Sequence, residues 1–140
     1  MASERLVLDA SYVLEAILPT SGTWQFEAFD SMDRIASGEI EAHVPWVFFA
    51  EVAATVTRKT RGGRIDPQDA LGFLLQVDAL GLRVDPPGSR SLALHQAAMR
   101  WHAGAYDAIY LDLAARLAAA LATRDRGMAA AARAGGVAAF

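Results

Sequence analysis

Hydrophobic residues along this chain follow two patterns, short apolar runs and longer stretches with helical spacing. Residues 5–8 form a short run rich in branched side chains that leads directly into an aspartate, which is typical of a strand. In residues 24–37, by contrast, Ala28, Met32 and Ile35 recur every three or four positions, as on one face of an amphipathic helix. The two patterns alternate along the chain.

The same patterns predict the remaining elements. The predicted strands are residues 5–8, 41–44, 82–84, 121–123 and 137–140. The predicted helices are residues 11–18, 24–37, 45–60, 67–80, 89–102, 107–118 and 125–134. Strands that alternate with helices indicate an α/β fold, here a three-layer α/β/α domain around a mostly parallel central sheet of four to five strands. We expect residues 1–140 to form one such domain, because the sequence shows no repeat and no low-complexity linker.

Several residues suit the predicted ends of these helices. Pro45 suits the first turn of a helix, and Asp66 and Ser89 suit N-caps. Gly38 and Gly81 follow helices as stop signals.

Composition narrows the class of protein. The 140 residues are 54% hydrophobic and include no cysteine, which excludes disulfides, zinc–thiolate sites and thiol nucleophiles. No apolar run reaches the roughly 18 residues of a membrane span, and the first residues lack the apolar core of a signal peptide. We therefore expect a cytoplasmic protein without a membrane partner.

Four acidic residues stand inside or directly after strongly apolar segments: Asp9, Glu51, Asp107 and Asp125. Carboxylates are rarely buried unless they are paired or bound to a cation. Asp9 and Asp125 also fall at the predicted carboxyl ends of strands, where ligand sites form in open parallel sheets. If the four gather at one edge of the sheet, a divalent metal ion is the expected counter-charge.

Three of the four carboxylates also have a purely structural interpretation. Asp9 could cap the next helix, although Ser11 is equally placed to do so, and Asp107 could be an N-cap. Glu51 could form a buried pair with an arginine, although its helix otherwise carries apolar residues over most of its surface. Thr123, two residues before Asp125, and Ser11 beside Asp9 could each position a metal-bound water or merely cap locally.

Helix geometry excludes several other polar residues from the expected metal site. Asp112 points about 140° away from Asp107 on a helix, and Arg116 four residues later suits a surface ion pair with it. His95 and His102 would stand about 10 Å apart along their helix, too far to bind one metal. A ligand set of carboxylates alone favours Mg²⁺, with Mn²⁺ as a substitute, over zinc.

Positive charge is concentrated in one segment although the net charge is −3. Arg58, Lys59, Arg61 and Arg64 follow one another in RKTRGGR without an intervening acid. The polar positions Glu51, Thr55 and Arg58 form a stripe that leads to this basic run. A plainer explanation of the run is a solvent-exposed carboxyl-terminal end of a helix, where the helix dipole favours positive charge.

With these residues in view, the chain resembles PIN-domain ribonucleases, and most of all the VapC-type toxins of bacterial toxin–antitoxin pairs. The resemblance runs through four segments in order: LVLDASYVL with Asp9, FFAEVAATV with Glu51, YDAIYLDLAARL with Asp107, and LATRDRGMAAAARAGGV with Asp125. Each segment alone is a weak signal, whereas all four at this spacing are specific. No further acid follows Asp125, so the number of metal ions, one or two, stays open.

The resemblance implies a function and partners. Mg²⁺ held by the four acids would support hydrolysis of RNA phosphodiesters, and the basic run Arg58, Lys59, Arg61 and Arg64 would bind the RNA backbone. It also implies a homodimer and a cognate antitoxin protein.

Two alternatives compete with this interpretation. Phosphotransfer and phosphatase domains of similar architecture use a lysine late in the chain, whereas the single lysine here is Lys59. A non-catalytic PIN-like module that binds RNA or protein, or a free-standing PIN nuclease without an antitoxin, stays open. Retention of all four acids argues against the binding module, because clustered carboxylates without a role only destabilise a fold.

Overall fold

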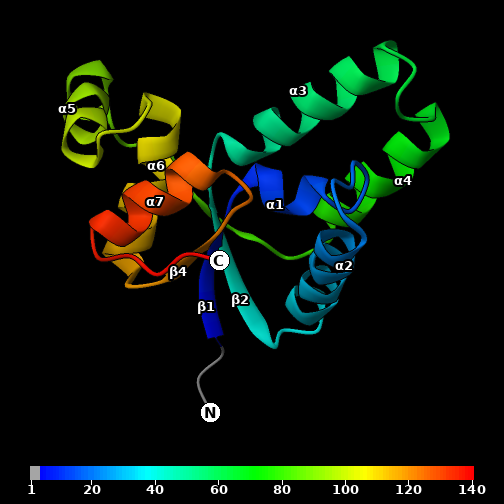
Figure 1. Ribbon diagram of the computed structural model, residues 1–140, viewed down its shortest axis with the longest axis horizontal. Coiled ribbons are helices and arrows are strands. Elements are labelled where there is room, and N and C mark those ends of the chain that lie inside the picture. Colours follow the sequence, from blue (N-terminus) through cyan, green and yellow to red (C-terminus); the bar gives the residue numbers. More distant parts are fainter. Residues whose placement is uncertain (1–3) are drawn as a thin grey trace.

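The computed structural model describes residues 4–140, and its centre is a sheet of four parallel strands (Figure 1). Its strands are β1 (Glu4–Leu8), β2 (Ile40–Pro45), β3 (Arg83–Asp85) and β4 (Ala120–Ala122). Their order across the sheet is β3-β2-β1-β4, and every neighbouring pair is parallel. This confirms the predicted α/β class and the parallel sheet.

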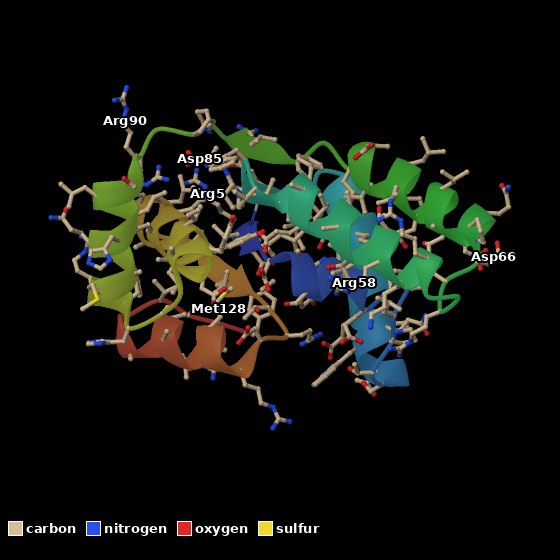
Figure 2. The ribbon with its side chains drawn as sticks, turned by 90° about the horizontal axis from the view of Figure 1, so that it is seen from above. Arg5, Arg58, Asp66, Asp85, Arg90 and Met128 are labelled. Carbon is tan, nitrogen blue, oxygen red and sulfur yellow. The ribbon has the colours of Figure 1, made fainter. Side chains whose placement is uncertain are left out.

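Two groups of helices enclose the sheet. The helices are α1 (Ala10–Leu14), α2 (Gly22–Ala36), α3 (Phe48–Arg61), α4 (Pro67–Asp78), α5 (Ser91–Trp101), α6 (Ala105–Leu117) and α7 (Arg126–Ala134). Helices α1 to α4 lie on one side of the sheet and α5 to α7 on the other, as both views show (Figures 1 and 2). The architecture is therefore three-layered. Within residues 4–140, no helix combines the length and the apolar character needed to cross a membrane.

The core explains the uninterrupted apolar runs of the sequence. Leu6, Val7 and Leu8 of β1 are all almost completely buried, because helices cover both faces of the central strand. Helix α6 contributes the fully buried Tyr110 and Leu111 from one side. A central strand covered on both faces shows no alternation of polar and apolar residues, as observed here.

Two predicted helix starts are wrong. Pro45 does not open a helix but ends β2, where it pairs with Asp85 of β3. Proline is tolerated there because β1 has already ended at Leu8, so no strand on that side needs its missing amide donor. Ser89 is not the cap of α5 either, since the N-cap position is Arg90 and no side chain caps that end. The predicted N-cap Asp66 is confirmed, because its side chain accepts from two amides of α4. Helix α2 begins at Gly22, two residues before its predicted start.

Helix α3 is more exposed than its sequence suggested. Its buried residues are Phe48, Val52 and Val56, a single seam of four-residue spacing. Ala53 and Ala54 are exposed, because α3 and α4 extend away from the sheet (Figure 1). Apolar residues near Glu51 are therefore exposed to solvent as well, and the polar stripe is not the only solvent-facing part of the helix.

The end of the described chain continues the sheet. Leu121 forms a parallel bridge with Ala139, in place of the predicted strand 137–140. The amide of Thr123 also donates to the carbonyl oxygen of Phe140 at 2.9 Å. These bonds hold the carboxyl end of β4 from its outer side, which helps to position Thr123.

The junction between α7 and α5 offers a test of this packing. A Cβ atom at Gly135 would lie 2.3 Å from Cζ3 of Trp101, whose indole nitrogen donates to Asp112 at 2.5 Å. We expect Gly135→Ala to lower the free energy of unfolding by about 1–3 kcal/mol, because the ring has to shift. The matched control is Gly72→Ala in α4, where the added methyl meets open space and should stabilise the helix by about 0.5–1 kcal/mol. Urea denaturation of both variants measures the difference, and equal effects would contradict the packing.

Candidate active site

The carboxyl ends of β1 and β4 meet at one edge of the sheet. Leu8 pairs with Ala122, so that Asp9 and Thr123 follow them side by side. The amide of Asp9 donates to the carbonyl oxygen of Ala122 at 2.9 Å. Asp9 is only 5% exposed, and its side chain makes no capping hydrogen bond to α1. The interpretation of Asp9 as a side-chain cap is therefore wrong, although the residue occupies the N-cap position of α1.

Two hydroxyl groups hold the Asp9 carboxylate. Ser11 Oγ and Thr123 Oγ1 both donate to Asp9 Oδ2, the latter at 2.9 Å. Each hydroxyl in turn accepts a backbone amide, that of Arg124 at 2.9 Å for Ser11 and that of Asp125 at 3.0 Å for Thr123. The segment between β4 and α7 is thereby tied to the start of α1 (Figure 1). Ser11 and Thr123 consequently fix the position of Asp9.

Glu51 has a different partner from the arginine considered above. The hydroxyl of Tyr110 in α6 donates to Glu51 Oε1 at 2.8 Å. Tyr110 is completely buried, and burial, followed by the charge of Glu51, raises the pKa of its hydroxyl, which stays protonated as a donor. Tyr110 is not among the site residues predicted from the sequence. Its signal was the spacing of three residues from Asp107, which places both on one face of α6.

Asp107 lies in the first turn of α6 without capping it. The N-cap position is Gly104, so the capping alternative for Asp107 is also wrong. Asp107 is partly buried, and among residues 4–140 it forms no hydrogen bond or ion pair through its side chain. Asp112 is structural as predicted, but its partners are Trp101 and Arg100. Arg116 instead pairs with Asp85 at 2.7 Å.

Asp125 is exposed and caps helix α7. Its Oδ1 accepts from the amide of Met128 at 3.0 Å, a capping role that the sequence did not predict. Its backbone amide is the one that donates to Thr123. Asp125 thus joins the network around Asp9 through the main chain and faces the site from α7.

The carboxylates influence one another electrostatically. Burial raises the pKa of Asp9, Glu51 and Asp107, and neighbouring negative charge raises each further. For Asp9 that neighbour is Asp125, for Glu51 it is Asp9 and Asp107, and for Asp107 it is Asp125 and Asp9. None of the four forms an ion pair with a basic side chain in the part of the chain described here. The site therefore carries uncompensated negative charge.

The four carboxylates are near one another but are not gathered around a single point. Within the described range, no group of three or more His, Asp or Glu side chains is arranged so that it could hold a metal ion. Glu51 is held toward Tyr110, and Asp125 is held toward the amides of α7. The donor chemistry nevertheless fits a divalent cation, because oxygen ligands with excess negative charge suit Mg²⁺ or Mn²⁺.

The basic run lies at the far end of α3. Arg58, Arg61 and Arg64 are exposed, Lys59 is partly buried, and none of them forms an ion pair within residues 4–140. Figure 2 shows Arg58 on α3, away from the sheet. The run is not part of the carboxylate site, and the stripe from Glu51 through Thr55 connects the two along one helix.

Comparison with known proteins identifies the family. The model of the PIN domain matches residues 6–134, so the chain belongs to the PIN domain family. PIN domains are generally metal-dependent nucleases. Among solved structures, PAE2754 from Pyrobaculum aerophilum has the same fold, with a TM-score of 0.69 and 24% identity over 99% of this chain and 85% of that chain. A PilT N-terminus domain protein, SSO1118 from Sulfolobus solfataricus P2, matches with a TM-score of 0.45 and 17% identity over 97% of this chain and 85% of that chain. No curated protein sequence matches the chain.

The electrostatic strain at Glu51 can be measured in metal-free protein. A carboxyl group whose pKa is raised by folding favours the folded state at low pH, and this contribution is lost as pH rises through the folded-state pKa. We expect Glu51→Gln to raise the free energy of unfolding at pH 7.5 by about 0.5 kcal/mol, a gain limited by solvent screening. The gain should shrink toward pH 4.5, where Glu51 becomes protonated, and the Gln carbonyl can still accept from Tyr110.

The control for this measurement is Glu41→Gln. Glu41 has its pKa lowered, chiefly by the hydrogen bond with His43 and then by Arg83 and Arg5, so the same substitution should not stabilise there. Urea titrations with EDTA at both pH values give the comparison. A Glu51→Gln variant that is less stable than wild type at pH 7.5 would show that repulsion is not the dominant force on Glu51.

Proposed function

We propose that this chain is a metal-dependent endoribonuclease that hydrolyses RNA phosphodiesters, with Mg²⁺ held by Asp9, Glu51, Asp107 and Asp125. One observation carries the proposal. Burial, and then the charges of the others, raise the pKa of three of these carboxylates, which lie at the carboxyl edge of a parallel sheet without a basic partner in residues 4–140. Mn²⁺ is the expected substitute.

The polypeptide's own groups would prepare this site. Bound Mg²⁺ would supply an activated water and stabilise charge on the scissile phosphate. Ser11 and Thr123 hold Asp9 in one orientation through its Oδ2 atom. Tyr110 similarly holds Glu51, and its burial keeps this hydroxyl away from competing water. These three residues are positioning residues.

The basic run at the end of α3 is proposed to bind the RNA backbone. Arg58, Lys59, Arg61 and Arg64 have no acidic partner among the described residues, so their charge is free to neutralise phosphates. The stripe of Glu51, Thr55 and Arg58 leads from the carboxylates to this run. An RNA bound at the site could thus follow α3.

The biological setting is proposed from the resemblance of the four motifs. We propose a cytoplasmic toxin of a bacterial toxin–antitoxin pair that consists of one PIN domain, forms a homodimer and is inhibited by a cognate antitoxin. Co-expression with a small protein encoded directly upstream should relieve growth arrest if this assignment holds. A chain that cleaves RNA and has no such partner would be a free-standing PIN nuclease instead.

Cleavage of a structured RNA tests the central proposal. We expect hydrolysis with Mg²⁺ or Mn²⁺ and none with EDTA. Asp9→Asn and Asp107→Asn should each lower kcat by about 100-fold or more, since each removes a charge that the metal requires. The matched control is Asp112→Asn, the same substitution on the helix of Asp107 but outside the site, which should cleave like wild type.

The outcomes separate the two candidate functions. Equal cleavage by wild type, Asp9→Asn and Asp107→Asn would contradict the metal-nuclease proposal. Absence of cleavage by all three, with tight RNA binding retained, would favour the non-catalytic binding module. That second candidate is favoured by one observation, namely that the carboxylates of residues 4–140 are not arranged as a ready ligand cluster.

Thr123 allows the positioning role to be tested separately. Thr123→Val removes the hydroxyl that donates to Asp9 but keeps the shape of the side chain. We expect kcat to fall by about 10- to 100-fold, with a higher Mg²⁺ concentration needed for half-maximal activity. Thr123→Ser keeps the hydroxyl and should restore most of both values. If the two variants behaved alike, the hydroxyl would not be what positions Asp9.

A further inference from the structure

A pocket of about 370 Å³ adjoins the candidate active site on the side of α7. It shares Thr123 and Asp125 with that site. Its other walls come from α2, α7 and the end of the described chain, and they include Trp24, Arg126 and Phe140. A polymeric ligand bound at the carboxylates could therefore place its next unit in this neighbouring pocket.

One wall of the pocket is aromatic and held in place by Arg124. The guanidinium carbon of Arg124 lies 4.5 Å from the ring centroid of Tyr12 and 4.9 Å from that of Trp24. Its Nη2 atom donates to Glu27 at 2.5 Å, while its buried Nε has no hydrogen-bond partner in residues 4–140. Contact with a cation fixes the indole of Trp24, which is only partly buried. Trp24 is thereby a pre-positioned stacking surface.

The opposite wall is cationic and comes from α7. Arg126 and Arg133 are seven residues apart and so lie on one side of this helix, with the small Ala129 between them. Both are exposed, and Arg133 is steadied by donating to the carbonyl oxygen of Ala139 at 3.1 Å. Neither forms an ion pair within the described residues. Two guanidinium groups, about 10 Å apart along the helix axis, are thus available to neighbouring anions.

An aromatic surface beside paired guanidinium groups matches the chemistry of a nucleotide. Any base can stack on an indole, because every base has a flat π-face. Arginine binds phosphate oxygens in forked contacts. We propose that this pocket binds one unpaired nucleotide of the RNA, whose base stacks on Trp24 and whose two flanking phosphates are bound by Arg126 and Arg133, one by each. The inference rests on the proposed ribonuclease function, and it places this nucleotide next to the phosphodiester that is cut.

The location gives the RNA a direction across the molecule. Helix α7, which carries Met128, lies on one side of the sheet, and α3, which carries Arg58, lies on the other (Figures 1 and 2). Asp9 and Asp125 follow β1 and β4 between these two regions. The RNA would enter over the basic run of α3 and leave its neighbouring nucleotide in the α7 pocket.

Binding of RNA in the absence of metal tests the pocket independently of cleavage. The full chain is titrated, with EDTA, into a fluorescent single-stranded RNA octamer, and anisotropy is measured at several salt concentrations. Trp24→Leu should weaken binding about tenfold and leave the salt dependence unchanged, because it removes stacking alone. The double variant Arg126→Gln/Arg133→Gln should weaken binding and lower the slope of log K against log salt by about 1.4, as expected for two phosphate contacts on a single strand.

Controls separate the pocket from general charge and from misfolding. Arg90→Gln removes an exposed arginine beyond α5, far from α7 in Figure 2, and should bind like wild type. Trp24→Phe keeps a stacking ring and should recover most of the affinity that Trp24→Leu loses. An octamer with one abasic position next to the cut should lower the affinity of wild type but not that of Trp24→Leu.

Cleavage kinetics then distinguish the two proposals. If wild type cleaves RNA, the pocket variants should raise KM with little change in kcat. If wild type does not cleave but the variants still lose RNA affinity, the nuclease proposal fails and the pocket stands. The pocket proposal is overturned if wild type binds no single-stranded RNA, or if the variants bind as tightly as Arg90→Gln with an unchanged salt slope.

Discussion

The parallel pairing of β1 with β4 is the constraint on which the rest of the site depends. These strands are far apart in the sequence, and their register, Leu8 opposite Ala122, places Asp9 beside Thr123. The hydroxyls of Thr123 and Ser11 can then satisfy the Asp9 carboxylate, which is only 5% exposed. A shift of one residue would turn these side chains to opposite faces of the sheet, so the register is also a condition for the chemistry.

Charge at this edge is organised differently from charge elsewhere in the molecule. Glu15 is as buried as Asp9, but its two oxygens are satisfied by the amide and hydroxyl of Thr20, each at 2.8 Å. Glu41 is surrounded by Arg5, His43 and Arg83. The carboxylates of the site have no basic partner among the described residues, and burial, followed by the charge of the other carboxylates, raises the pKa of three of them. A fold retains such repulsion at a cost in stability, which is typical of a functional site.

The short segment that precedes helix α7 contributes both to the carboxylate site and to the proposed nucleotide pocket. Thr123, Arg124 and Asp125 connect β4 to this helix, and each faces a different environment. Thr123 bonds to Asp9, Arg124 packs against Tyr12 and Trp24, and Asp125 caps the helix. The segment therefore ties the carboxylates to the proposed nucleotide pocket, and the spacing between the two is set by three consecutive residues.

The sequence by itself determined the α/β class, the positions of most strands and the four acids, because each is a pattern among near neighbours. An apolar run that meets a carboxylate is visible without knowledge of the fold. The tertiary structure alone decided the partners: Tyr110 for Glu51, and Asp85 rather than Asp112 for Arg116. It also decided that Pro45 ends a strand and that one face of α3 is exposed. These outcomes depend on contacts between residues distant in the chain, and local spacing carries no information about which distant side chain will fill a given place.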